Sequence, residues 1–139
     1  MYPAELTDPM RTELTSIGVE ELRDAAAVDA AVAAPGTTFV MVNSVCGCAA
    51  GGARPGLGLA LRNAAHKPSR VTTAFAGVDR EATDRVRSHL VGFPPSSPSM
   101  ALFKDGDVVW MMHRHQIEGR HPEDIAQVIE AAFAEHCAS

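Results

Sequence analysis

The chain has 139 residues, with 12 Lys or Arg and 17 Asp or Glu, so its formal net charge is −5. This length suits one domain with a hydrophobic core, and the acidic balance argues against a nucleic-acid partner, which needs a concentrated basic face. No apolar run approaches the roughly 20 residues that cross a bilayer, and the charged segment from Met1 to Leu14 lacks the pattern of a signal peptide. We therefore expect a cytoplasmic protein without a membrane partner.

Helical and extended patterns alternate along the chain. The run from Phe39 to Val42 is apolar without interruption, which predicts a strand buried on both faces of a sheet. Strands that alternate with helices give parallel crossovers, and a terminal hairpin adds an antiparallel edge, so the expected fold is α/β with a mixed sheet. In chain order we expect a helix at 4–14, an edge strand at 19–22, a helix at 25–33, a strand at 37–43, a helix at 49–65, a strand at 70–77, a helix at 80–90, a loop at 92–98, hairpin strands at 100–104 and 108–112, and a last helix from 122.

Prolines and aspartates give local expectations. Pro9 weakens the first predicted helix, and Pro55 is expected to kink the helix at 49–65 near its second or third turn. Asp24 and Asp79 are the expected N-caps of the helices that follow them, because their short side chains can accept the unpaired N–H groups of a first turn.

Two of the three cysteines lie at the carboxyl end of the buried strand, in the sequence Cys46-Gly47-Cys48. A thiol at the start of a helix faces unpaired N–H groups and the positive end of the helix dipole, which stabilise the thiolate. We therefore interpret Cys46 as the nucleophile and Cys48 as the resolving thiol. A disulfide across one intervening residue closes a small ring and should be reduced easily.

Two other interpretations of this cysteine pair remain open. Free cysteines are often inert packing residues, although a Cys-x-Cys pair at a strand-to-helix turn makes this the weaker interpretation. Cys46 and Cys48 could instead join His113 and His115, taken to alternate along an extended segment, in a metal-binding module. The spacing is tighter than the usual two to four residues between paired ligands of structural zinc sites. No metal is therefore expected.

Two further residues lie outside this motif. Arg54 is a candidate for positive charge near the thiolate and for a substrate contact, with a surface arginine as the alternative. Cys137 is close to the chain end, in a region that we expect to fray, and has no assigned role.

The segment from Pro98 to Gly106 resembles the part of thioredoxins in which a cis-proline opens a strand of the sheet. This resemblance implies that Pro98 is a cis-proline packed against the active-site cysteines and that its neighbour Ser99 contacts substrate. Pro55 also resembles the proline of the thioredoxin active-site helix. Thioredoxins carry Trp-Cys-x-x-Cys, whereas this chain has one residue fewer between its thiols.

A narrower resemblance covers nearly the whole chain. The segments Val42 to Gly51, Ala53-Arg54-Pro55, Phe75-Ala76-Gly77, Pro95 to Leu102, Arg114-His115 and Ile117-Glu118-Gly119 are similar to those of bacilliredoxins. The resemblance implies one thioredoxin-like domain over residues 1–139, a three-layer sandwich with an N-terminal helical extension at about 1–18.

The same resemblance implies thiol-disulfide exchange in which Cys46 attacks. A bacilliredoxin removes a low-molecular-weight thiol, bacillithiol, from mixed disulfides with client proteins, and the small thiol serves as co-substrate in place of a bound cofactor. Disulfide-bonded client proteins are the substrates of the alternative function, a protein disulfide isomerase or general thiol reductase.

Overall fold

The central strand of the sheet is β2 (Thr37–Asn43), in which every residue is buried. The computed structural model describes residues 2–138 and has a five-stranded sheet with the order β1-β3-β2-β4-β5. β2 runs parallel to β3 (Arg70–Phe75) and antiparallel to β4 (Ser99–Lys104). The edge strand β1 (Glu20–Glu21) is parallel to β3, and β5 (Asp107–Met112) completes the hairpin with β4. The expected mixed sheet with an antiparallel edge is confirmed.

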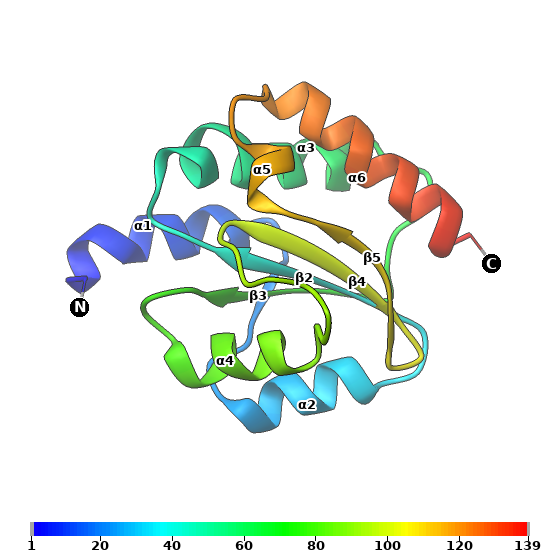
Figure 1. Ribbon diagram of the computed structural model, residues 1–139. Coiled ribbons are helices and arrows are strands. Elements are labelled where there is room, and N and C mark those ends of the chain that lie inside the picture. The colour runs from blue at the N-terminus through cyan, green and yellow to red at the C-terminus, as the bar shows by residue number, and fades with distance from the viewer. Residues whose placement is uncertain (1, 139) are drawn as a thin grey trace.

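Helices cover both faces of the sheet, as Figure 1 shows. One face carries α1 (Ala4–Thr15), α3 (Arg54–Asn63) and α6 (Pro122–His136), and the other carries α2 (Ala25–Ala33) and α4 (Arg80–Ser88). None of the helices formed by residues 2–138 is long and apolar enough to cross a membrane.

Each face of the sheet has its own apolar core, because side chains alternate along a strand. Phe39 and Met41 of β2 pack in the core under α3 and α6, whereas Val40 and Val42 pack in the core under α2 and α4. The buried strand thus anchors both layers of helices and fixes where its carboxyl end emerges.

The structure confirms the first helix and the Asp24 cap and corrects the expected Asp79 cap. Helix α1 continues through Pro9, which lies on the exposed side, so that water can solvate the carbonyl group that lost its partner. Asp24 caps α2 by accepting a hydrogen bond from the Ala27 N–H group at 2.8 Å. Asp79 makes no such cap and instead accepts a hydrogen bond from Arg11 at 2.9 Å.

The helix that follows the cysteines has two parts. A wide π-helical turn, η1 (Ala49–Ala53), precedes α3, and Pro55 lies in the first turn of α3. The expected kink inside a longer α-helix is therefore wrong. Pro55 has no N–H group to donate inside a regular helical turn. The residue before it, Arg54, donates its N–H group to the Ala49 carbonyl across the wide turn.

The segment formed by η1 and α3 packs closely against α6 through two glycines. A Cβ atom added to Gly52 would lie 3.0 Å from Ile125 Cδ1, and one added to Gly56 would lie 2.7 Å from Ile125 Cγ2. Small residues at both positions let α3 and η1 approach α6, which holds the cysteine-bearing segment against the sheet.

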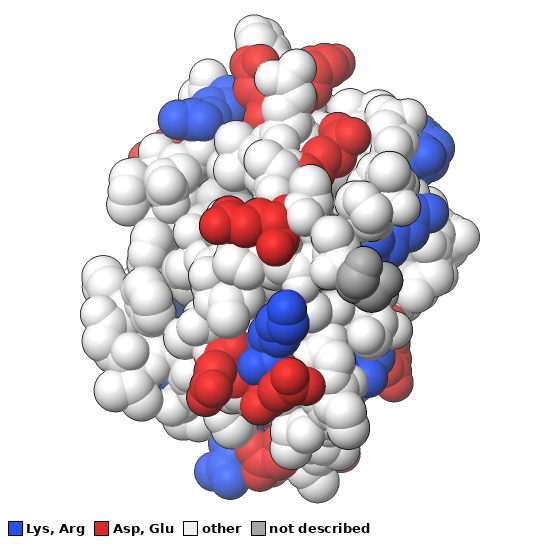
Figure 2. Space-filling model, turned by 90° about the vertical axis from the view of Figure 1, so that its right-hand side faces the viewer, with Lys and Arg blue, Asp and Glu red and all other residues white. Residues whose placement is uncertain are grey.

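Figure 2 views the molecule from the side that lies on the right of Figure 1, at the end of the sheet where β2 begins. Acidic and basic side chains are interspersed among uncharged atoms on this face. The positive charge on this face is therefore not gathered into one patch, and the cysteine turn lies at the other end of β2.

The close contact of Gly56 with α6 gives a first prediction. We expect Gly56→Ala to lower the free energy of unfolding by about 1–2 kcal/mol, because overpacking outweighs the better helix propensity of alanine. The measurement is denaturant unfolding followed by circular dichroism. Gly58→Ala in the same helix is the matched control, since its added Cβ would meet its nearest atom, Ile17 Cδ1, at an ordinary 3.7 Å. Equal stability changes in both variants would contradict this account.

Candidate active site

The turn at the end of β2 places Cys46 immediately before a helix. The Ala50 N–H group donates a hydrogen bond to the Cys46 carbonyl at 3.2 Å, which marks the first helical turn. The Cys46 N–H group donates to Ser44 Oγ at 3.2 Å, so the serine side chain folds back over the turn. Cys46 and Cys48 are both partly exposed and carry free thiols. The expected strand-to-helix position of the cysteine pair is confirmed.

The pKa of the Cys46 thiol lies below its ordinary value. Partial burial is the largest single influence and opposes ionisation, but four favourable contributions together outweigh it. These are hydrogen bonds from the Ser44 side chain and the backbone N–H groups of Ala49 and Cys48, and the positive charge of Arg114. Cys46 is thus the thiol whose anion the surroundings favour.

The second thiol has the opposite balance. Burial and the nearby Cys46 raise the pKa of Cys48, with a smaller contribution from Glu118, although Arg114 opposes them. Cys48 Sγ lies 3.8 Å from a Glu118 carboxylate oxygen and 3.8 Å from an Arg114 guanidinium nitrogen. The surroundings therefore favour the thiolate of Cys46 over that of Cys48.

Arg54 is buried beneath the turn, with only 3% of its surface exposed. Its guanidinium donates to the Ser44 carbonyl at 2.8 Å, to Asn43 Oδ1 at 3.0 Å and to the Glu13 carboxylate at 2.8 Å. The interpretation as a surface arginine is wrong, and the expected substrate contact is also wrong because the side chain is not accessible. Arg54 instead holds the turn that carries Cys46.

The peptide bond between Ser97 and Pro98 is cis, as the resemblance to thioredoxins implies. Pro98 is buried next to β4, whose first residue, Ser99, pairs with Val42 in β2. The expected contact of Ser99 with substrate stays a prediction, and its side chain points inward. That side chain is 2% exposed, and its hydroxyl donates to the Ser96 carbonyl at 3.0 Å.

Two charged residues of the site were not found by inspection of the sequence. Arg114 and Glu118 lie on and just after the short helix α5 (Arg114–Ile117), which follows β5 and brings both side chains beside the cysteines. Arg114 also donates to the Ser97 carbonyl at 3.1 Å and lies 3.3 Å from the Glu118 carboxylate. The only sequence signal was that both lie in segments similar to those of bacilliredoxins.

The histidines of the alternative metal site do not lie on an extended segment. His113 precedes α5 and His115 lies within it, with their rings stacked 5.5 Å apart at an interplanar angle of 9°. Within residues 2–138 no three His, Cys, Asp or Glu side chains are gathered as a metal ion requires. The proposed set of two cysteines and two histidines is therefore not assembled in this structure.

Cys137 lies at the opposite end of β2 from Cys46. Burial raises the pKa of its thiol, which is hydrogen-bonded with Thr37 at the start of the strand. It packs against the apolar core rather than against the other cysteines.

The whole chain can be compared with known families. The sequence pattern of the disulphide isomerase family matches residues 2–137. A bacilliredoxin of Salinibacter ruber is 50% identical over 138 residues, which cover 98% of this chain and 81% of that protein. A bacilliredoxin of Koribacter versatilis is 51% identical over 138 residues, covering 99% and 94%. The chain belongs to the bacilliredoxin family.

Solved structures with the same fold are more distant in sequence. A mutant thioredoxin from Halobacterium salinarum has a TM-score of 0.61 at 10% identity and covers 88% of this chain and 94% of its own. The oxidised thioredoxin from Plasmodium falciparum has a TM-score of 0.56 at 14% identity, with coverage of 87% and 100%. The fold is thioredoxin-like, and this member of the bacilliredoxin family is a thiol-disulfide oxidoreductase.

The buried position of Arg54 gives a prediction about stability and reactivity. We expect Arg54→Ala to lower the free energy of unfolding by about 2–4 kcal/mol, because the buried Ser44 carbonyl loses its side-chain donor and Asn43 Oδ1 loses one of its two donors. The turn at Ser44 should loosen, and the pKa of Cys46 should rise. Denaturant unfolding and the pH dependence of Cys46 alkylation measure these two effects.

Two further variants test the origin of this effect. Arg62→Ala, at an exposed position of the same helix, should change stability by less than about 0.5 kcal/mol. Arg54→Lys should recover part of the stability. An Arg54→Ala variant with unchanged stability and an unchanged alkylation profile would contradict the role assigned to this side chain.

The charge of Arg114 gives a prediction about pH dependence. This cation stabilises the Cys46 thiolate, so Arg114→Gln should raise the pKa of Cys46 and move its alkylation profile to higher pH. Glu118→Gln should lower the pKa of Cys48, because the carboxylate disfavours a nearby thiolate. Iodoacetamide kinetics on single-cysteine variants measure both profiles. A shift of either profile in the opposite direction would refute this electrostatic account.

Proposed function

We propose that this oxidoreductase removes a low-molecular-weight thiol, bacillithiol, from mixed disulfides with client proteins. The observation that carries the proposal is the ordering of the two thiols, in which the surroundings lower the pKa of Cys46 and raise that of Cys48. The bacilliredoxin names of the relatives support the choice of small thiol. No bound cofactor is needed, because the small thiol is the co-substrate.

The first step transfers the small thiol to Cys46. The Cys46 thiolate attacks the sulfur atom of the small thiol, a new disulfide forms between them, and the client sulfur leaves as a thiolate that takes a proton from water. The client protein is thereby reduced, and the small thiol remains on Cys46 as a mixed disulfide.

The second step clears Cys46. Cys48 loses its proton to water. The Cys48 thiolate then attacks the Cys46 sulfur and releases the small thiol as a thiolate, leaving a disulfide between the two cysteines. A second small thiol can instead attack the adduct, forming a symmetrical small disulfide and restoring the Cys46 thiolate.

A second candidate function is disulfide isomerisation in protein substrates. The description of the matching family, disulphide isomerase, favours it. Isomerisation requires attack by Cys46 on a protein disulfide and no small thiol. Recovery of activity from a scrambled ribonuclease without added small thiol would support this alternative.

The mass of a trapped adduct tests the main proposal. Cys48→Ala cannot resolve the mixed disulfide, so mixing it with a bacillithiolated protein should add the mass of one bacillithiol to the intact variant. The adduct should disappear in a Cys46→Ala Cys48→Ala double variant. It should persist in a Cys48→Ala Cys137→Ala double variant, because Cys137 lies at the other end of β2. Absence of the adduct in Cys48→Ala would overturn the proposal.

A further inference from the structure

A small pocket of about 110 Å³ lies between the end of α4 and the loop that leads to Pro98. Most of its wall is apolar and consists of Leu90, Phe93, Pro94, Pro95 and Met111. The one charged side chain in the wall is Arg87, from the last turn of α4. None of these residues takes part in the steps described above.

Arg87 is a cation with an unused hydrogen-bond donor. Its Nε atom is buried and has no hydrogen-bond partner among residues 2–138. Arg85, in the same helical turn, instead binds both carboxylate oxygens of Asp29, at 2.8 and 2.7 Å. A buried N–H group without an acceptor costs free energy, and a carboxylate can accept two parallel hydrogen bonds from one guanidinium. A ligand with a carboxylate would therefore supply the acceptor that Arg87 lacks.

The pocket has room for a side chain rather than for a whole small molecule. Its volume of 110 Å³ corresponds to about four water molecules at roughly 30 Å³ each, which suits a short side chain. Pockets that enclose small molecules begin at about 300 Å³. The carboxylate is therefore expected at the end of a side chain that enters from outside.

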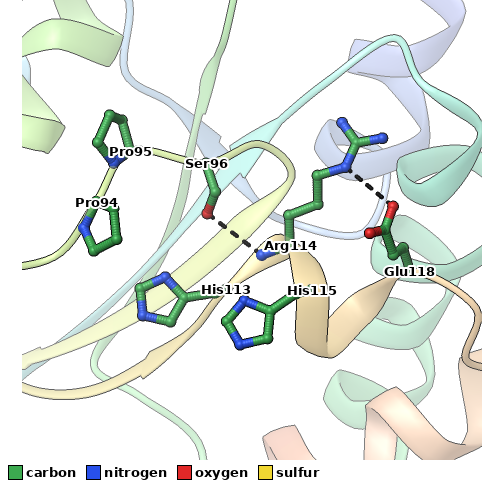
Figure 3. A pocket seen from close by; sticks show the side chains of 7 residues that line it. All are labelled: Pro94, Pro95, Ser96, His113, Arg114, His115 and Glu118. Carbon is green, nitrogen blue, oxygen red and sulfur yellow. Dashed lines mark hydrogen bonds and ion pairs between the residues drawn. The ribbon is translucent and has the colours of Figure 1, made fainter.

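The loop at residues 94–96 connects the pocket to the redox centre, and Figure 3 shows its Ser96 bound to Arg114. Ser96 Oγ accepts a hydrogen bond from the Arg114 N–H group at 3.3 Å, and the Arg114 guanidinium lies 3.8 Å from Cys48 Sγ. A client cysteine must approach Cys46 during thiol transfer, so the segment around it passes close to this loop. Since an extended chain advances about 3.3 Å per residue, a side chain a few residues from the client cysteine comes within reach of the pocket.

The surroundings of the pocket favour a protein segment over a free anion. Val91 and Phe93 lie on the connection between α4 and β4, and they are 84% and 38% exposed. A protein segment covers apolar surface of this kind when it binds, whereas a small inorganic anion covers almost none. The net charge of −5 also disfavours an anion that is attracted by charge alone.

We propose that this pocket binds the carboxylate side chain of an Asp or Glu residue of the client protein, which Arg87 holds through its Nε and Nη N–H groups. The apolar wall packs against the methylene groups of that residue, and Val91 and Phe93 contact its neighbours. The inference rests on the proposed function, because it concerns the protein half of the mixed disulfide. Arg87 is thus a specificity-determining residue for clients with an acidic residue near the reacting cysteine.

Peptides with a single cysteine measure this preference. Each peptide carries bacillithiol on its cysteine and one Glu at a position from three residues before to three residues after it, and the matched peptide carries Gln instead. A Cys48→Ala protein takes the bacillithiol onto Cys46 and releases the peptide thiolate, and mass spectrometry gives the rate at low peptide concentration. The ratio of the Glu rate to the Gln rate cancels changes in the reactivity of Cys46. We expect a ratio of about ten at one or two positions.

Variants of Arg87 test the origin of this ratio. Arg87→Gln should bring it close to one, and Arg87→Glu should instead favour a peptide with Lys at the same position. Arg87→Lys keeps the charge but loses the planar fork, so it should keep only part of the preference. Arg80→Gln removes the same charge from an exposed position at the start of α4. This matched control should keep the ratio of the parent protein.

The outcomes separate the pocket from the proposed function. A ratio close to one at every position in the parent overturns the acidic-client site, although adducts on Cys46 would then still support the proposed function. An equal fall of the ratio in Arg87→Gln and Arg80→Gln also overturns the site, because the preference would then come from overall charge. A parent ratio of one, together with inhibition by sulfate that Arg87→Gln abolishes, overturns it and assigns the pocket to a free anion.

Adducts with none of the peptides contradict the proposed function itself. A peptide with Ser in place of Cys cannot react, so its affinity tests the pocket in that case too. Fluorescence anisotropy should show tighter binding of the Glu form than of the Gln form to the parent protein and equal binding of both to Arg87→Gln. Equal affinities for the parent protein would overturn the site.

Discussion

The bond network of Arg54 is the constraint on which the redox site depends. A buried guanidinium binds the Ser44 carbonyl and Asn43 Oδ1, the two groups that end β2, and so fixes the direction in which the chain leaves the sheet. Ser44 in turn accepts a hydrogen bond from the Cys46 N–H group and helps to lower the pKa of the thiol. A side chain that substrate cannot reach thus holds the residue whose hydroxyl helps to lower the pKa of the partly exposed Cys46 thiol.

The two thiols of one short motif acquire different reactivity from their surroundings. Cys46 receives backbone N–H groups and the Ser44 hydroxyl, whereas Cys48 lies between the guanidinium of Arg114 and the carboxylate of Glu118. Arg114 of α5 and Glu118, which follows this helix, supply both charges from a segment distant in sequence from the cysteines. The active site is therefore assembled from the end of β2, the loop before β4 and the segment after β5, which adjoin because β2, β4 and β5 are neighbours in the sheet.

The sequence predicted the parts of this arrangement that have a local signal. The apolar run of β2, the Asp24 cap and the cysteine turn were predicted correctly, since each depends on neighbouring residues, and the resemblance to thioredoxins predicted the cis bond at Pro98. Helix α5 was missed because four residues are too few to show helical periodicity. The burial of Arg54 was not predictable because its partner Glu13 is 41 residues away in sequence.

The position of Glu13 on α1 matters for any homologue that lacks this helix. Among the described residues, the Glu13 carboxylate is the only negative charge that Arg54 contacts. Glu13 belongs to α1, which precedes the first strand of the sheet. A homologue that begins at the first strand would keep all five strands and both thiols yet leave a buried cation without its counter-ion. Such a protein would need another acidic residue at this place, or a neutral side chain in place of the arginine.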